Sequence, residues 1–142
     1  MNSDIKPKPL RLWAGRVISG IVILVLLADA LVNLAAPQKL AAEMAATGFS
    51  AALATPLAVI IVVCALVYAV PSTSVLGAIL ITAFAGGSIA VHFRLAEIGS
   101  PPQIVSALIA VFAWIGLLLR YPALWTWLPY VSAETRRSSM PS

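Results

Sequence analysis

Residues 17–34 read VISGIVILVLLADALVNL, an apolar run interrupted only by Ser19, Gly20, Asp29 and Asn33. A helix needs about 20 apolar residues to cross the hydrocarbon core of a bilayer, and this run nearly supplies them. A cleaved signal peptide is the alternative, because the preceding tail is basic and small residues follow at positions 35 and 36. The run is longer than the apolar part of a signal peptide and contains a carboxylate, so it favours a transmembrane helix.

The composition of the whole chain also indicates a membrane protein. Of its 142 residues, 61% are hydrophobic and only 10% are charged. Soluble domains carry roughly 25% charged residues, so this chain has too few charges to cover a water-facing surface. Its net charge of +4 comes from basic residues at the ends of apolar runs. No basic cluster alternates with aromatic residues, and we therefore exclude nucleic acid as a partner.

Three further apolar runs follow the first. We predict an all-α, polytopic membrane protein, a four-helix transmembrane bundle over residues 17–119, with helices at 17–36, 53–70, 75–94 and 104–119. Residues 1–16 are expected to form a tail in which prolines prevent an early helix, and residues 37–52 a polar connection. Residues 71–74 form a tight turn, Ser100-Pro101-Pro102 is a helix-start signal, and residues 120–142 form the C-terminal tail.

Basic residues predict the orientation of the bundle. The side that carries both termini has seven lysines and arginines, namely Lys6, Lys8, Arg11, Arg16, Arg120, Arg136 and Arg137. The opposite side has Lys39 and Arg94. The positive-inside rule therefore places both termini in the cytoplasm of a bacterial cell, with the chain in the inner (plasma) membrane. An interfacial aromatic belt is expected on the same side from Trp13, Tyr121, Trp125, Trp127 and Tyr130.

Polar residues inside the apolar runs are the candidate functional residues. Four of them belong to the outer half of the bundle: Asp29, Asn33, His92 and Arg94. Counted from the cytoplasmic ends of their apolar runs, at Val17 and Val75, Asp29 lies roughly 18 Å and His92 roughly 25 Å along the helix. An ionisable side chain in hydrocarbon is costly, so it is paired or functional. Three interpretations of these residues stay open. They can form an ion pair that locks two helices, they can form a ligand or proton site, or their side chains can extend to the membrane interface. Arg94 is the expected partner of a buried Asp29, and His92 is expected to contact another helix or the outer loop.

Small residues recur with helical spacing in the third run. Ala83, Gly87 and Ala90 share a face with Arg94, while Ala85 and Ser88 share the opposite face with His92. Small residues allow helices to approach closely in lipid. We therefore predict that the third helix is central and packs through Ala83, Gly86, Gly87 and Ala90. The Gly86-Gly87 pair has neither the strand nor the spacing of a nucleotide site.

Residues 71–94 read PSTSVLGAILITAFAGGSIAVHFR, with Pro-x-Thr, Leu-Gly-Ala, Gly-Gly and His-x-Arg in that order. With RVISG at 16–20, Asp29 and the ending from Trp114 to Arg120, the chain resembles the DoxX-like family of small bacterial four-helix membrane proteins. The resemblance covers roughly residues 11–130. The family often has a lysine one turn after the first-helix acid, where this chain has Asn33. A role that needs that cation would fall to Lys39 or Arg94.

The resemblance implies the four-helix fold, and distant members are described as membrane subunits associated with quinone-linked sulfur-compound oxidation or redox-stress complexes. We therefore expect an accessory or anchoring subunit of a redox or stress-related membrane complex, with the bilayer and a membrane protein or a second copy as partners. The alternative is a binding protein or carrier for a small hydrophobic molecule such as a quinone, held by Asp29, His92 and Arg94. A stand-alone oxidoreductase is least favoured, because these residues hold no redox group. With one cysteine, Cys64, and one histidine, neither a resident cofactor nor a metal is expected.

Overall fold

The computed structural model describes residues 9–127, and this part of the chain consists of helices joined by short turns and loops, with no strands. The five α-helices are α1 (Pro9–Ala35), α2 (Pro37–Ala46), α3 (Ala54–Ala69), α4 (Ser74–Arg94) and α5 (Pro101–Arg120). Two short 3₁₀ helices, η1 (Ala51–Leu53) and η2 (Pro122–Trp127), complete the described elements. Four helices, α1, α3 with η1, α4 and α5, are long and apolar enough to cross a membrane. The predicted fold class is confirmed, and the chain is a multi-pass membrane protein.

Proline positions explain where the helices begin. α1 begins at Pro9, inside the stretch that we expected to be a tail. Proline is tolerated in the first turn because its missing N–H would have no partner there, so Pro9 starts the helix and does not block it. α5 begins in the same way, with Pro101 and Pro102 in its first two positions. That start is the one predicted from the Ser100-Pro101-Pro102 signal.

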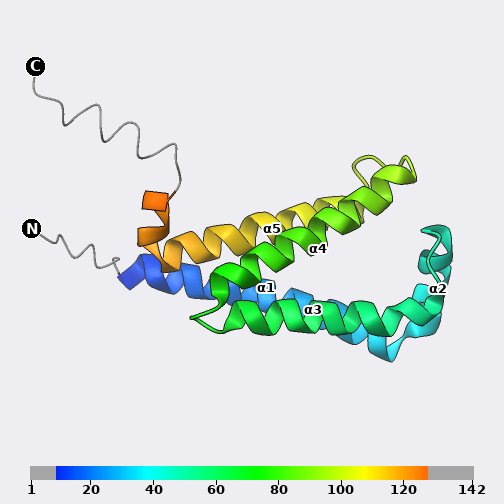
Figure 1. Ribbon diagram of the computed structural model, residues 1–142, viewed down its shortest axis with the longest axis horizontal. Coiled ribbons are helices and arrows are strands. Elements are labelled where there is room, and N and C mark those ends of the chain that lie inside the picture. Colours follow the sequence, from blue (N-terminus) through cyan, green and yellow to red (C-terminus); the bar gives the residue numbers. More distant parts are fainter. Residues whose placement is uncertain (1–8, 128–142) are drawn as a thin grey trace, which may run out of the picture.

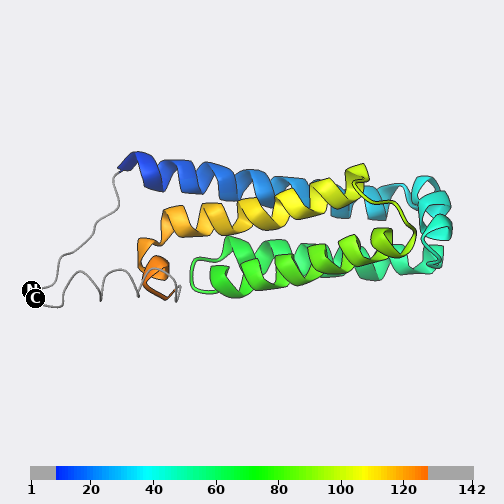
Figure 2. The same cartoon turned by 90° about the horizontal axis from the view of Figure 1, so that it is seen from above.

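Helix α2 replaces most of the polar connection expected between the first two membrane-crossing helices. It lies across one end of the bundle (Figures 1 and 2). Gly48 terminates it with a φ of +79°, a conformation that favours glycine. The N–H groups of Gly48 and Phe49 donate to the carbonyls of Ala45 and Met44, at 3.0 and 2.8 Å. These bonds turn the chain sharply towards α3.

The four long helices form a ring in the order α1, α3, α4, α5, in which each helix packs against two neighbours. α4 occupies one corner of this ring, so the prediction that it is the central helix is wrong. Figure 1 shows that α1 and α3 diverge from α4 and α5 towards the end covered by α2. We call this the splayed end, near Asp29 and residues 95–100. The closed end, near Tyr68 and Gly116, is where the helices converge.

Glycines bring the backbones together at the closed end. A Cβ atom on Gly77 of α4 would overlap the backbone of Tyr68 in α3. A Cβ atom on Gly116 of α5 would lie 2.6 Å from Oγ of Ser19, and one on Gly15 would lie 2.9 Å from Cγ of Arg120. Only glycine allows such close approach between helices, so these three positions set the narrow end of the bundle.

The small residues predicted to pack against other helices lie instead on the outside of α4. Ala83, Gly86, Gly87 and Ala90 are exposed, and a Cβ atom on either glycine would meet nothing within 4 Å among the described residues. The face that α4 buries carries Gly77, Ala78, Ile81 and Ala85. The prediction chose the wrong face, because both faces contain small residues with helical spacing and the sequence pattern does not distinguish them.

A chain of hydrogen bonds joins three helices at the closed end. The hydroxyl of Tyr68, which is fully buried, donates to the carbonyl of Ala113 at 2.7 Å. Its oxygen can therefore accept from Ser19, whose Oγ lies 3.0 Å away and itself accepts from Arg120 at 3.3 Å. The hydroxyl groups of Tyr68 and Ser19 both have hydrogen-bond partners in this network, as buried polar groups require. Arg120, one of the basic residues used above to predict the orientation, is thus also part of the helix packing.

The aromatic belt is only partly within the described residues. Trp13 and Trp125 are exposed at the closed end, and Tyr121 is half-buried there beside Arg120. Tyr130 and the side chain of Trp127 lie outside the described part of the chain. Four of the basic residues used for orientation also lie outside it: Lys6, Lys8, Arg136 and Arg137.

Candidate functional site

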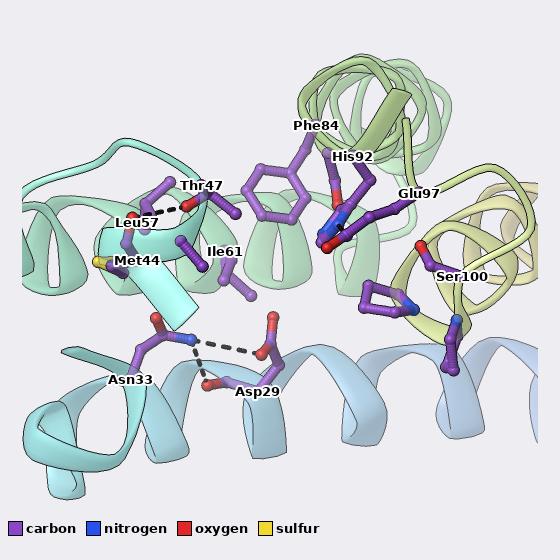
Figure 3. A pocket seen from close by; sticks show the side chains of 14 residues that line it. Asp29, Asn33, Met44, Thr47, Leu57, Ile61, Phe84, His92, Glu97 and Ser100 are labelled. Atoms are coloured by element: carbon purple, nitrogen blue, oxygen red, sulfur yellow. Dashed lines mark hydrogen bonds and ion pairs between the residues drawn. The ribbon is translucent and has the colours of Figure 1, made fainter. Parts of the chain in front are cut away.

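A cavity of about 500 Å³ occupies the splayed end of the bundle. Its walls come from α1, α2, α3, α4 and the residues that lead into α5 (Figure 3). Apolar residues such as Ile61 and Phe84 form part of the lining, and seven polar residues also belong to it: Asp29, Asn33, Thr47, Ser88, His92, Glu97 and Ser100. The cavity exists because the helices diverge here, whereas glycine contacts close the other end.

Asp29 and Asn33 enter the cavity from α1, one helical turn apart. The Asn33 amide donates to the backbone carbonyl of Asp29 at 2.8 Å and to its carboxylate at 3.3 Å. Asn33 is buried, but Asp29 is exposed to the cavity. No described Lys, Arg or His nitrogen lies within 4.0 Å of its carboxylate. The expectation of an Asp29 buried in an ion pair with another helix is therefore wrong.

His92 faces the same cavity from the last turn of α4. Its Nδ1 lies 2.7 Å from Oε2 of Glu97, in the loop between α4 and α5. We expected His92 to contact another helix or the outer loop, and the contact with this loop confirms that expectation. Sequence reasoning missed Glu97, although it is the only acid between Arg94 and the start of α5. That position, five residues after the single histidine, was the available signal.

Arg94 does not reach the cavity. Its Nη2 donates to the backbone carbonyl of Thr47 at 3.4 Å, so it ties the end of α4 to the turn after α2. The predicted pairing of Arg94 with Asp29 is wrong, because Arg94 lies two positions after His92 on the helix and its side chain therefore points to a different side. The side chain of Lys39, the other candidate for the missing family lysine, lies outside the described part.

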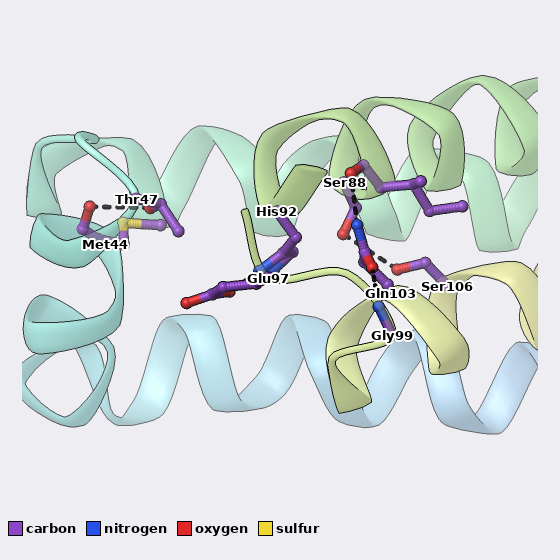
Figure 4. Close-up of polar contacts among 9 residues, drawn as sticks. Met44, Thr47, Ser88, His92, Glu97, Gly99, Gln103 and Ser106 are labelled. Carbon is purple, nitrogen blue, oxygen red and sulfur yellow. Dashed lines mark hydrogen bonds and ion pairs between the residues drawn. The ribbon is translucent and has the colours of Figure 1, made fainter. Parts of the chain in front are cut away.

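A second set of hydrogen bonds fixes the rim of the cavity (Figure 4). Gln103 is buried, accepts from the backbone N–H of Gly99 at 2.8 Å and donates to the carbonyl of Ile89 at 3.2 Å. Ser106, one turn later on α5, donates to Ser88 at 3.0 Å. These bonds hold the loop of residues 95–100 and the start of α5 against α4. The sequence analysis missed Gln103 and Ser106, whose spacing of three residues places them on one helix face.

The hydroxyl oxygen of Ser100 adds an unused polar atom to this rim. Ser100 lines the cavity, and its Oγ is buried without a hydrogen-bond partner among the described residues. An unpartnered buried hydroxyl is costly unless something else bonds to it. The rim therefore has hydrogen-bonding capacity that the protein itself does not satisfy.

The arrangement suits a small molecule with a polar head and an apolar body. Two carboxylates, an imidazole and hydroxyl groups can bond to the head, while Ile61 and Phe84 contact apolar parts. The described residues hold no group of three or more His, Cys, Asp or Glu side chains that could bind a metal ion.

A family model described as the DoxX-like family matches residues 17–116, more than two thirds of the chain. The matched segment contains α2, α3 and α4 entirely and most of α1 and α5, so it includes the whole cavity lining. No curated protein and no solved structure matches the chain.

Proposed function

Because this chain belongs to the DoxX-like family of membrane proteins, we propose that its cavity at the splayed end binds a small amphipathic molecule within the membrane. The observation that carries the proposal is the carboxylate of Asp29. It faces the cavity without a cationic partner among the described side chains. A carboxylate in hydrocarbon costs about 2.5–3.5 kcal/mol even on lenient scales, and a polar ligand would offset that cost.

The hydrogen-bonding groups indicate what kind of head the ligand has. An ionised Glu97 only accepts, so the Nδ1 atom of His92 carries the proton between them. With its one proton on Nδ1, a neutral imidazole has Nε2 as an acceptor, and this form of His92 would add to the carboxylate oxygens of Asp29. These acceptors favour a head that donates O–H groups. A quinol has two such groups, whereas the oxidised quinone has only carbonyls, so the reduced form should bind more tightly.

Titration of the purified protein with reduced decylubiquinone tests this function. His92→Ala should weaken binding about tenfold, because it removes one hydrogen bond to the ligand and releases Glu97. Arg94→Ala is the matched control, since Arg94 lies two residues away on the same helix and outside the cavity; its affinity should equal that of the wild type. Equal losses in both variants, or no saturable binding, would overturn the proposal.

For its location, we propose the bacterial inner (plasma) membrane with both termini in the cytoplasm. The closed end carries Arg11, Arg16 and Arg120, whereas the described cation at the splayed end is Arg94. The positive-inside rule then places the splayed end, and with it the cavity, on the outer side of the membrane. A ligand in the cavity would lie at the depth of the outer leaflet.

The outer face of α4 supports a second proposed role, that of an accessory or anchoring subunit in a redox or stress-related membrane complex. Gly86 and Gly87 contact nothing within the described chain, and small residues are what helices use to approach each other in lipid. Gly87→Leu should abolish copurification of a partner helix, from another membrane protein or a second copy, and leave the monomer folded. An unchanged set of copurifying proteins would argue against this role.

A further inference from the structure

Three cavities in the bundle lie next to one another and share lining residues. The polar cavity at the splayed end shares Asp29, Phe84 and Ser88 with a second cavity of about 430 Å³. That second cavity shares Val25, Val105 and Ile109 with a third of about 300 Å³, which lies between α1 and α5. The three cavities therefore form a series from Asp29 to the outer surface of the bundle, and we call this series the passage.

The polarity of this passage falls from one end to the other. The first cavity contains two carboxylates and an imidazole. The second keeps Asp29 and two serines among apolar residues. The third is lined by eight residues that are all aliphatic or aromatic, four of them from α1 and four from α5. Several of these, including Ile21 and Leu108, are exposed on the lipid-facing surface.

The length of the passage matches a lipid-like tail. Its apolar end begins at Ile18 and its polar end at Asp29. Eleven residues of helix span about 16 Å, which is roughly half of a hydrocarbon core about 30 Å thick. The passage is therefore about as long as an acyl chain of one leaflet.

The third cavity is too small to enclose a protein helix. A helix about 10 Å across would need on the order of 1,000 Å³ over this length. The third cavity offers about 300 Å³, which leaves room for a hydrocarbon chain.

From the adjacency of these cavities and the fall in their polarity, we propose that the ligand has a single long apolar tail, which lies in the groove between α1 and α5 while its hydroxyl-bearing head lies beside Asp29 and His92. The ligand enters sideways from the lipid, because the groove opens on the membrane-facing surface. This inference rests on the proposed function and deepens it, since it assigns the ligand to the tailed, membrane-soluble amphiphiles.

Photo-crosslinking in lipid nanodiscs tests where the tail lies. The probe is a reduced dodecyl ubiquinone analogue with a diazirine at the tip of its tail, used with and without excess reduced decylubiquinone. Crosslinks should fall on residues 18–25 of α1 and 105–112 of α5, and the competitor should abolish them. Leu108→Trp should fill the groove and remove most of this crosslinking. Val111→Trp, which is exposed on α5 but lines none of the three cavities, should leave it unchanged.

Titration of the same samples with a quinol that has no tail distinguishes the proposed function from the proposed tail groove. Tail-less ubiquinol should bind the wild type and Leu108→Trp with equal affinity. If the head binds but crosslinks scatter over outward-facing residues such as Ile79, the tail groove is refuted and the function stands. If a diazirine-tagged phospholipid labels the groove as strongly, and the quinol does not displace it, the groove belongs to bilayer lipid. If neither quinol binds, both proposals fall.

Discussion

His92 and Glu97 hold the mouth of the cavity together: Nδ1 of the histidine lies 2.7 Å from Oε2 of the glutamate. The contact joins the last turn of α4 to the loop before α5, and both side chains line the cavity that contains Asp29. Arg94, two residues after His92, bonds to Thr47 instead. His92 thus lines the cavity, whereas Arg94, two positions later on the same helix, lies outside it.

Double-mutant cycles should detect the first of these contacts and no contact between Asp29 and Arg94. The Glu97 side chain is 48% exposed, so we expect a coupling of only about 0.5–1 kcal/mol between His92→Gln and Glu97→Gln. Asp29→Asn and Arg94→Gln should be additive within about 0.5 kcal/mol. The measurement is the free energy of unfolding in mixed micelles. A larger coupling for Asp29 with Arg94 than for His92 with Glu97 would contradict the described geometry.

Leucine substitutions should distinguish the two glycine faces of α4. Gly77→Leu should destabilise the bundle by about 3 kcal/mol or more, because its Cβ would overlap the backbone of Tyr68. Gly87→Leu should leave the thermal stability of the monomer nearly unchanged, because a Cβ atom at Gly87 would meet no other described part of the protein within 4 Å. Thermal unfolding of both variants checks the order, and a Gly87→Leu variant that is the less stable of the two would refute the placement of these faces.

The hydroxyl of Tyr68 should contribute measurably to the closed end. Tyr68→Phe removes the bonds to Ala113 and Ser19 and should lower the free energy of unfolding by about 1–2 kcal/mol. Tyr121→Phe serves as the control, because its bond to Pro71 is longer, at 3.4 Å, and exposed. The two variants should differ clearly in denaturant titrations. Equal stability would mean that the buried chain of hydrogen bonds does not hold the helices.

Reporter fusions should reveal the orientation of the bundle. Fusions in residues 39–46 of α2 and in residues 95–99 should report the outside of the cell, and fusions after Pro71 and at the C-terminus should report the cytoplasm. The positive-inside rule supplies the reason. A cytoplasmic signal from residues 95–99 would place the cavity on the inner side and overturn the proposed location.

Sequence patterns were sufficient for the four membrane-crossing helices. Apolar runs, prolines and the polar breaks between runs depend on local chemistry, so α3, α4 and α5 begin and end close to the predicted residues. Helix α2 was missed because it has only ten residues, and these mix polar and apolar side chains. Pro9 was misread because the same residue both blocks a helix interior and suits a helix start.

The candidate site was only half predictable. Asp29, Asn33 and His92 were identified because polar residues are conspicuous in an apolar run, and all three line the cavity. Which charged side chains would meet could not be predicted, since that depends on how far the helices splay. The choice between the two small-residue faces of α4 also depends on helix packing, because Gly77 and Gly87 look alike in the sequence.

The most direct test of the cavity is a labelling measurement that uses the single, buried cysteine of this chain. In a Cys64→Ala background, Ser88→Cys places a thiol in the cavity lining and Ala83→Cys places one on the outer face of α4. Saturating reduced decylubiquinone should slow maleimide labelling at Ser88→Cys about tenfold or more, in line with ligand mass action, and leave Ala83→Cys unaffected. Labelling at Ser88→Cys that is equally fast with and without the quinol would contradict a ligand site at the splayed end.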